Sequence, residues 1–433
     1  MKNLFRISLV LLLCTISNAH ALLQIEITKG MQGALPIAIQ SFRDETGVFS
    51  QQQGVAGIVA DDLYRSGKFS PLAVDKMPAP SVQGSAIHFS EWRALGVDNL
   101  LTGVIKRVGG NAYVVKFRLY DVLSSKMLEG RNIPITVDQL RRAAHHISDI
   151  VYEVLTGRPG AFNTQIAYVT STGQQAAKRY QLQIADADGY AEQEILTSRQ
   201  PIMSPAWSPD GRRLAYVSFK NKRSHIYVQD VEQGSRKVMP SFPGINGAPS
   251  WSPDGQSLAL TLSKDGNPEI YILNIASEKL HRLTRSPAID TEPAWSPQGE
   301  YIVFTSDRGG KPQLYKIPVQ GGHAKRISFE GNYNADASFS PDGKYIAMVH
   351  GNRGRFQIGV INMESGVLRL VSSGKLDESP GFSPNGDMII FATQVDGRGV
   401  LSAISVDAKI SQQLKRASGE VRDPSWSPYL RTK

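Results

Sequence analysis

The arrangement of apolar and polar residues changes near residue 160. Beyond this point short apolar runs recur, for example 214–219, 258–263 and 301–306, and each lies between turns rich in Pro, Gly, Asp and Asn. Short apolar runs bounded by such turns are typical of buried β-strands. The larger, C-terminal part of the chain is therefore expected to be all-β.

The turns of this part form an internal repeat. An aromatic residue followed by Ser-Pro recurs with spacings of 44, 44, 44, 43 and 44 residues. Pro-Asp-Gly usually completes the motif, where Pro presets the turn, Asp bonds nearby backbone and Gly adopts a positive φ. Each repeat predicts four strands, and four-stranded units of about 40–45 residues are typical of β-propeller blades. The aromatic positions are Trp207, Trp251, Trp295, Phe339, Phe382 and Trp426.

The first and last units are incomplete in complementary ways. Residues 166–171, 180–186 and 192–198 predict three strands with no aromatic motif before them, whereas no strands follow the motif at Trp426. We expect the C-terminal strand to complete the first blade and to close a six-bladed propeller over residues 158–433. Closure removes the open sheet edges that favour aggregation.

Residues 22–157 carry no repeat and predict a separate α/β domain. Its expected strands are 22–28, 34–42, 100–108 and 112–122, and its expected helices are 54–69, 90–97 and 137–157. The last helix has an apolar stripe that includes Ile147 and Val151, and Gly157 is expected to end it. Residues 156–164 would then connect the two domains.

Residues 1–21 have the features of a secretory signal peptide. Lys2 and Arg6 precede a short apolar run, and Ala19-His20-Ala21 offers a cleavage site. The mature chain would lack cysteine, because Cys14 is the only one, and no later stretch is long and apolar enough to span a membrane. A nucleic-acid partner is not expected, because the mature chain would be exported and its 46 basic residues, against 39 acidic ones, are scattered along the sequence.

The motifs of common enzymes are missing from the sequence. It has no Gly-x-Ser-x-Gly elbow, His-Glu-x-x-His or P-loop, and His145-His146 is interpreted as a surface or packing pair. Polar or small residues do recur three positions before each aromatic residue, where the innermost strand of a blade would begin. We expect them to form a polar binding mouth in which Glu292, Asp336 and Asp423 could hold Ca²⁺. These positions are Ser204, Ala248, Glu292, Asp336, Ser379 and Asp423.

The whole layout resembles the TolB family of the Tol-Pal system. The residues that carry the resemblance are 57–72 (GIVADDLYRSGKFSPL), 141–169, 201–219, 246–255, 291–299 and the terminal WSPYL. The resemblance implies a non-enzymatic periplasmic monomer without a required cofactor. Such proteins bind the lipoprotein Pal by one propeller face and TolA by the mature N-terminus, and colicins exploit the same face. They maintain outer-membrane integrity and draw that membrane inward during division.

Carried over by position, the resemblance assigns two binding regions. Ile245 stands where a histidine is familiar in the family, which bears on the details of the contact with Pal. The N-terminal segment suits strand addition, and we expect it to pack between the domains in one state and to be released in another. The TolA segment would be Leu22, Leu23, Gln24, Ile25, Glu26 and Ile27; the Pal face would be Ile245, Asn246, Ala248, Thr291, Glu292, Asn334, Asp336, Glu378, Arg422 and Asp423.

Two other interpretations remain open from the sequence. The chain could be an enzyme, either a fragment of a propeller peptidase or a lyase that uses the channel carboxylates. It would then act on peptides or glycans, and changing Glu292 or Asp336 would abolish that activity. Alternatively, it could bind a sugar or another small ligand, which predicts saturable binding without a protein partner.

Overall fold

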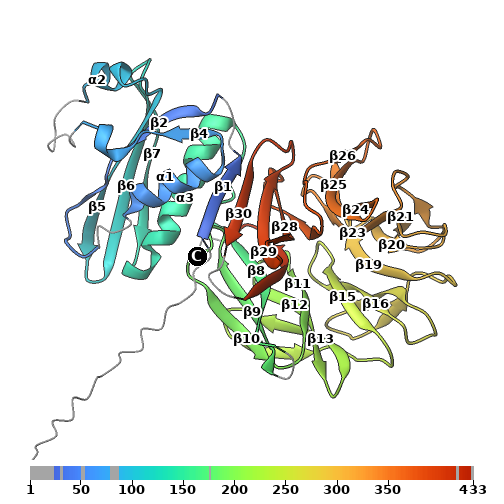
Figure 1. Ribbon diagram of the computed structural model, residues 1–433. Helices are drawn as coiled ribbons and strands as arrows, with labels where there is room; N and C mark the ends of the chain where they lie inside the picture. The colour runs from blue at the N-terminus through green and yellow to red at the C-terminus, as the bar shows by residue number, and fades with distance from the viewer. Residues whose placement is uncertain are drawn as a thin grey trace, which may run out of the picture.

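A computed structural model describes residues 24–29, 33–49, 54–78, 87–174, 177–415 and 419–430. The expected signal peptide, together with Leu22 and Leu23, lies outside the described residues. The chain forms a mixed α/β N-terminal sheet with helices beside a ring of antiparallel sheets (Figure 1). Within the described part of the chain, no helix has the length and hydropathy needed to cross a bilayer.

The N-terminal domain is built on one mixed sheet of order β4-β2-β5-β6-β7, with β3 paired to β5. The short strands β2 and β4 run parallel to each other, whereas β5, β6 and β7 form an antiparallel meander. The strands are β2 (Leu35–Ile39), β3 (Arg43–Asp44), β4 (Phe69–Pro71), β5 (Asn99–Gly109), β6 (Ala112–Asp121) and β7 (Lys126–Ile135).

Two long helices, α1 (Val55–Arg65) and α3 (Leu140–Thr156), pack their apolar stripes on one face of this sheet. Gly157 ends α3 in the left-handed conformation with φ of 72°, as the sequence predicts. The helix expected over 54–69 ends at Arg65, because residues 66–68 form a turn and Phe69 begins β4. The remaining helices are α2 (Phe89–Ala94) and the 3₁₀ turns η2 (Val74–Lys76) and η3 (Val137–Gln139).

The rest of the chain forms six blades. Blade 1 contains β8 (Gln165–Thr172), β9 (Arg179–Asp186), β10 (Gln193–Ser198) and β31 (Glu420–Trp426); blade 2 contains β11 (Ile202–Trp207), β12 (Arg213–Lys220), β13 (Arg223–Asp230) and β14 (Arg236–Val238). Blade 3 contains β15 (Asn246–Trp251), β16 (Ser257–Leu262), β17 (Glu269–Asn274) and β18 (Leu280–Arg282); blade 4 contains β19 (Asp290–Trp295), β20 (Tyr301–Ser306), β21 (Gln313–Pro318) and β22 (Lys325–Arg326). Blade 5 contains β23 (Tyr333–Phe339), β24 (Tyr345–Asn352), β25 (Arg355–Asn362) and β26 (Leu368–Leu370); blade 6 contains β27 (Glu378–Phe382), β28 (Met388–Val395), β29 (Arg398–Ser405) and β30 (Ser411–Lys415).

The C-terminal strand closes the ring, which confirms the predicted six-bladed propeller. β31 pairs antiparallel with β8, and Trp426 lies opposite Ile166. The tryptophans tie neighbouring blades together. The indole of Trp251 donates to the Ala206 carbonyl (3.0 Å), and that of Trp295 donates to the Ser250 carbonyl (3.2 Å). The aromatic repeat thus fastens each of these blades to the one before it.

The N-terminal strand β1 (Gln24–Lys29) extends blade 6 rather than the α/β sheet. It pairs antiparallel with β30, with Ile25 opposite Leu414 and Ile27 opposite Gln412. Figure 1 shows β1 running beside β30, between the helices of the first domain and the propeller. In this structure the segment lies where the two domains meet; its release in a second state stays a prediction.

Candidate functional site

Each blade begins with an irregularity at the position that the sequence singled out. At the third residue before every aromatic position φ lies between 46° and 55°, and the pairing register of the strand shifts there. This repeated feature is a β-bulge, which turns the strand and redirects its side chains. The six residues are Ser204 (50°), Ala248 (46°), Glu292 (53°), Asp336 (55°), Ser379 (54°) and Asp423 (48°).

A positive φ is unusual for residues other than glycine, and strain of this kind concentrates at functional sites. In five blades Pro follows the bulged residue, as in Ser204-Pro205. The six innermost strands enclose a channel of about 870 Å³ that includes all the bulged residues. The predicted polar mouth is therefore a ring of six left-handed residues at one end of this channel.

Two carboxylates in the ring also connect neighbouring blades. Glu292 Oε2 accepts hydrogen bonds from the backbone N–H of Asp336 (2.9 Å) and from Thr305 Oγ1 (2.8 Å). Asp423 Oδ2 accepts the backbone N–H of Ser204 (3.2 Å). In both pairs the carboxylate holds the bulge of the next blade. Glu292 and Asp423 therefore hold the backbone of the mouth in place and also give the mouth negative charge.

Burial disfavours the charged form of two aspartates at the mouth, Asp336 and Asp423. Burial, followed by the charges of Glu292 and Asp423, raises the pKa of Asp336 well above its usual 3.8. Burial also raises the pKa of Asp423, although the Ser204 N–H and Arg422 oppose this shift. Burial, followed by the charges of Glu292, Asp336 and Glu378, raises the pKa of Tyr333 to about 12. The mouth therefore favours a proton, a cation or a cationic donor from a partner.

The structure divides the residues assigned to the Pal face into three groups by exposure. Ile245 is 49% exposed, and Glu378 is also exposed. Asn246 and Asn334, in contrast, are 1% and 0% exposed. The rest are partly buried: Ala248, Thr291, Glu292, Asp336, Arg422 and Asp423.

The two buried asparagines shape loops and do not present a contact surface. The Asn246 side chain bonds to the Phe242 and Gly244 backbone, and the Asn334 side chain bonds to Gln313 and the Glu330 carbonyl. Asn246 is the first residue of β15 and Asn334 the second residue of β23, and each lies two residues before the bulged residue of its strand. Their expected role as direct contacts remains a prediction, but their bonding supports an indirect role.

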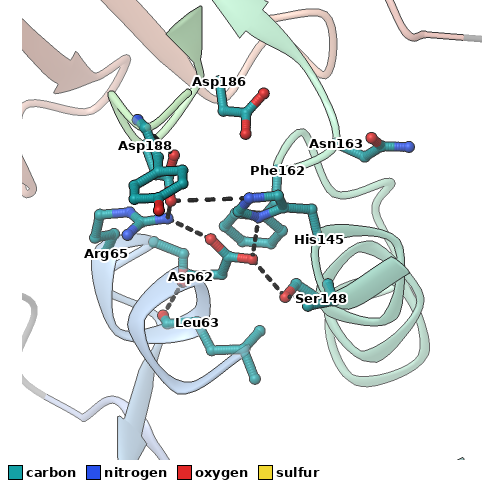
Figure 2. Close-up of polar contacts among 12 residues, drawn as sticks. Asp62, Leu63, Arg65, His145, Ser148, Phe162, Asn163, Asp186 and Asp188 are labelled. Atoms are coloured by element: carbon teal, nitrogen blue, oxygen red, sulfur yellow. Dashed lines mark hydrogen bonds and ion pairs between the residues drawn. The ribbon is translucent and has the colours of Figure 1, made fainter. Parts of the chain in front are cut away.

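A second polar cluster, which the sequence did not indicate, lies between the two domains (Figure 2). His145 on α3 is 2% exposed, and its Nδ1 lies 2.7 Å from Asp62 Oδ2 on α1. Ser148 Oγ donates to the same carboxylate oxygen (2.6 Å). His145 Nε2 faces Asp188 Oδ2 at 3.8 Å, from the turn between β9 and β10 of the propeller. The interpretation of His145 as a packing residue therefore missed its charged partners.

Arginines complete this cluster. Arg65 pairs with Asp62 and lies 3.8 Å from Asp188, and Arg141 pairs with both Asp188 and Asp186. Among the described residues, Asp62, His145 and Asp188 form the only group of three or more His, Cys, Asp or Glu side chains whose potential metal-ligand atoms all lie within 4.8 Å of one another. Because guanidinium groups already hold both carboxylates, the arrangement fits an ion-pair network between domains better than a metal site.

The protonation equilibria reflect the same network. Burial disfavours the charged imidazole, but the Asp62 carboxylate outweighs it, and the pKa of His145 is raised above 6.5. Burial also acts on Asp188, yet Arg65, His145 and Arg141 lower the pKa of this carboxyl. The network therefore stabilises the protonated form of His145 more than water would.

The chain matches two family descriptions: the TolB amino-terminal domain over residues 23–128 and the TolB beta propeller domain over residues 152–430. The Tol-Pal system protein TolB of Thioalkalivibrio sulfidiphilus is 56% identical over 425 residues, which cover 98% of each chain. That of Nitrosococcus oceani is 54% identical over 428 residues, covering 99% of this chain and 98% of its own. The crystal structure of TolB from Acinetobacter baumannii covers 94% of this chain and 100% of its own, with 42% identity and a TM-score of 0.86.

Proposed function

The chain belongs to the TolB family, and we propose that it acts in the periplasm as a monomeric scaffold that binds Pal and TolA. It is a non-enzymatic component of the Tol-Pal system. Its work in this proposal is to help maintain outer-membrane integrity and to draw that membrane inward during division. Colicins would use the same propeller face as parasitic partners.

Pal is proposed to bind across the mouth of the channel. The observation that carries this proposal is the ring of left-handed bulges, which places Ala248, Glu292, Asp336 and Asp423 around one opening. Around the opening, Ile245 and Glu378 are exposed, and Thr291 and Arg422 are partly exposed. The N-terminal domain bonds to turns at the other ends of the blades, at Asp188 and Asp387, and so leaves this mouth free.

The test is a titration of the mature chain, from Leu22, against the soluble domain of Pal from the same species. Glu292→Gln and Asp336→Asn in one variant would remove the charges while keeping oxygen atoms that can accept hydrogen bonds. We expect saturable binding by the parent and at least tenfold weaker binding by the variant. Glu300→Gln is a matched control, because Glu300 is exposed in the turn at the opposite end of blade 4. If the folded parent does not bind Pal, the proposal is wrong.

TolA is proposed to bind the N-terminal segment by strand addition. In the structure β1 occupies the edge of blade 6 and has no strand on its second edge among the described residues. An unpaired strand edge can accept a strand from a partner, and release of β1 from β30 would expose both edges. Residues 22–27 include Gln24, Ile25, Glu26 and Ile27, the described part of the assigned segment.

Deletion of residues 22–27 separates this role from Pal binding. We expect the deletion to abolish binding of the periplasmic domain of TolA and to leave Pal affinity within about twofold. Protease sensitivity of residues 22–33, measured with and without Pal, tests whether the segment has two states. Equal sensitivity in both samples would rule out coupling between the two sites.

A further inference from the structure

Charged residues are distributed unequally between the two ends of the propeller. Hairpins between the second and third strands lie at the same end as the channel mouth, because Ile202 at the start of β11 pairs with Ser218, near the Lys220–Arg223 hairpin. At this end the hairpins and the loops into each first strand expose four acidic residues, Asp265, Glu330, Glu378 and Asp396. They expose eleven basic residues: Arg179, Arg199, Lys220, Lys222, Arg223, Arg285, Lys311, Arg353, Arg355, Lys375 and Arg398.

The turns at the opposite end, counted with the strand residues that flank them, have a nearly even balance. Among the described residues they expose six cations, Arg212, Arg236, Lys279, Lys325, Lys344 and Lys409, against seven acidic residues. These acidic residues are Glu232, Asp254, Glu278, Glu300, Asp342, Glu364 and Asp407. The charge is therefore segregated along the channel axis and is not spread evenly over the surface.

The basic residues at the mouth also form a crescent over blades 5, 6, 1 and 2. No ion pair joins any cation of this crescent to a described residue. On blades 3 and 4, by contrast, Lys264 pairs with Asp265 (2.8 Å) and Arg308 pairs with Asp290 (2.7 Å). The crescent is Arg353, Arg355, Lys375, Arg398, Arg179, Arg199, Lys220, Lys222 and Arg223.

Large apolar side chains are exposed at the same end of the propeller. Met203, Ile245, Ile289 and Phe329 are 44%, 49%, 49% and 71% exposed. They lie on blades 2, 3, 4 and 5, where the chain enters the first strand of each blade. This apolar arc runs around the mouth from blade 2 to blade 5, so its two ends overlap the crescent and its middle lies over blades 3 and 4, between the ends of the crescent. Protein interfaces combine an apolar centre with a polar rim in this way.

We infer that this end of the propeller docks a folded protein whose surface has an apolar patch bordered by acidic residues, with the apolar patch over blades 2–5 and the acidic residues over the crescent. The inference rests on the proposed binding of Pal at the mouth and adds the chemistry and the orientation of the partner. The unpaired cations attract the acidic side during approach and set the rotation of the partner about the channel axis. Phe329, the most exposed member of the apolar arc, is the anchor that slows dissociation.

An anionic lipid surface is the competing occupant, and the mouth itself argues against it. Glu292, Asp336 and Asp423 lie inside the crescent, around the opening of the channel. A sheet of lipid phosphates over this opening would add negative charge to buried carboxylates. A protein can instead place a cation or a hydrogen-bond donor there while its acidic residues face the crescent.

Association kinetics of the mature chain with the soluble domain of Pal test the inference. A crescent variant carries Arg199→Glu, Lys220→Glu and Arg223→Glu, and a control variant carries Arg212→Glu, Lys279→Glu and Lys344→Glu. Both change the net charge equally, but at opposite ends of the propeller. We expect the crescent variant to associate about tenfold more slowly at low salt, with a weaker salt dependence, and the control to stay within about twofold of the parent.

Phe329→Ala tests the apolar arc separately. Because Phe329 is largely exposed, the fold does not depend on it, and we expect dissociation about tenfold faster with an unchanged association rate.

Equal effects of the two charge variants, or none from either, would overturn the inference while leaving Pal binding established. If the parent does not bind Pal, the proposed function falls and this inference falls with it. Binding to phosphatidylglycerol vesicles that only the crescent variant loses would favour the lipid occupant instead.

Discussion

The Tyr152 hydroxyl donates a hydrogen bond of 2.9 Å to Asp387 Oδ2, which lies 235 residues further along the chain. Tyr152 belongs to α3, and Asp387 lies in the turn between β27 and β28 of blade 6. Arg158 and Lys68 also pair with this carboxylate, at 2.6 and 3.7 Å. Asp387 therefore fixes blade 6 to the N-terminal domain, as Asp188 fixes blade 1. Carboxylates on neighbouring blades thus bind the N-terminal domain: Asp387 on blade 6, and Asp188 and Asp186 on blade 1.

Removing the carboxylate of Asp387 should loosen the domain contact. In Asp387→Asn, the hydrogen bond from Tyr152 and the pairs with Arg158 and Lys68 weaken, and bonds of this kind contribute about 2 kcal/mol. We expect faster hydrogen exchange in α3 and a lower thermal midpoint. Glu300→Gln is the control, because Glu300 occupies the same turn position in blade 4. Equal exchange in α3 for both variants would mean that Asp387 does not hold the domains together.

The contact at His145 should depend on pH. His145 faces Asp62 and Ser148 within the N-terminal domain, Asp188 and Asp186 on the propeller, and the nearby Arg65 and Arg141. Its pKa in the folded state is raised above 6.5, so the stability that protonation contributes is complete below pH 6.5. This contribution is lost as the pH rises through the raised folded-state pKa.

Thermal unfolding of the parent and of His145→Gln across this pH range checks the sign. Glutamine can still donate to Asp62 but carries no charge, so the parent should be more stable at acidic pH and the two should converge at alkaline pH. His146→Gln is the control, since burial lowers the pKa of His146. A difference that grows with rising pH would contradict the charged state of His145.

Regular features of the fold could be predicted from the sequence, and irregular ones could not. The aromatic repeat and the two incomplete end units were enough to predict six blades and their closure. The strand β7 was missed because KMLEGRNIPI combines charges, Gly130 and Pro134 and exposes most of its residues at the sheet edge. The strand β4 was missed because it has only three residues and the helix was expected to continue through Gly67, whose φ of 66° instead belongs to the turn that ends α1.

For the site, sequence spacing gave the positions of the residues but not their conformations. The same offset marks Ser204 and Asp336, yet nothing in either residue type predicts a left-handed bulge. Asn334 is polar and was expected in a loop, so the sequence could not show that it belongs to β23 and is buried against Gln313. The cluster at His145 joins segments far apart in the chain, and only the packing of the two domains brings Asp188 to it.

The charge of Asp336, a candidate cation ligand at the mouth, should affect the stability of the protein. The pKa of this carboxyl is raised well above 3.8. The protein is therefore most stable when Asp336 is neutral, and it loses stability as the pH rises from 3.8 through the raised pKa. We therefore expect Asp336→Asn to be more stable than the parent at neutral pH and no different below pH 3.8. Asparagine tolerates the left-handed conformation that Asp336 adopts.

Ca²⁺ should stabilise the charged form of Asp336 and so offset the stability that is lost when this residue ionises. If the ion binds among Glu292, Asp336 and Asp423, adding it at neutral pH raises the thermal midpoint of the parent more than that of Asp336→Asn, and acid removes the effect. Asp396→Asn is the matched control, because Asp396 is an exposed, left-handed aspartate at the same end of the propeller. An equal response of the parent and Asp336→Asn would exclude Asp336 as a ligand.

The bulge itself can be tested at Ala248, where φ is 46°. A left-handed conformation costs alanine about 1–2 kcal/mol, whereas a glycine loses about 0.4–1 kcal/mol of unfolded-state entropy relative to alanine. Ala248→Gly should therefore stabilise the protein by about 0.5–1 kcal/mol, measured by thermal unfolding. Ala294→Gly lies in a regular part of β19, where the glycine has only its entropic cost, and should destabilise by about 1 kcal/mol. If Ala248→Gly destabilises as much as Ala294→Gly does, the left-handed bulge carries no strain, and the ring at the mouth is simply the relaxed conformation of these strands.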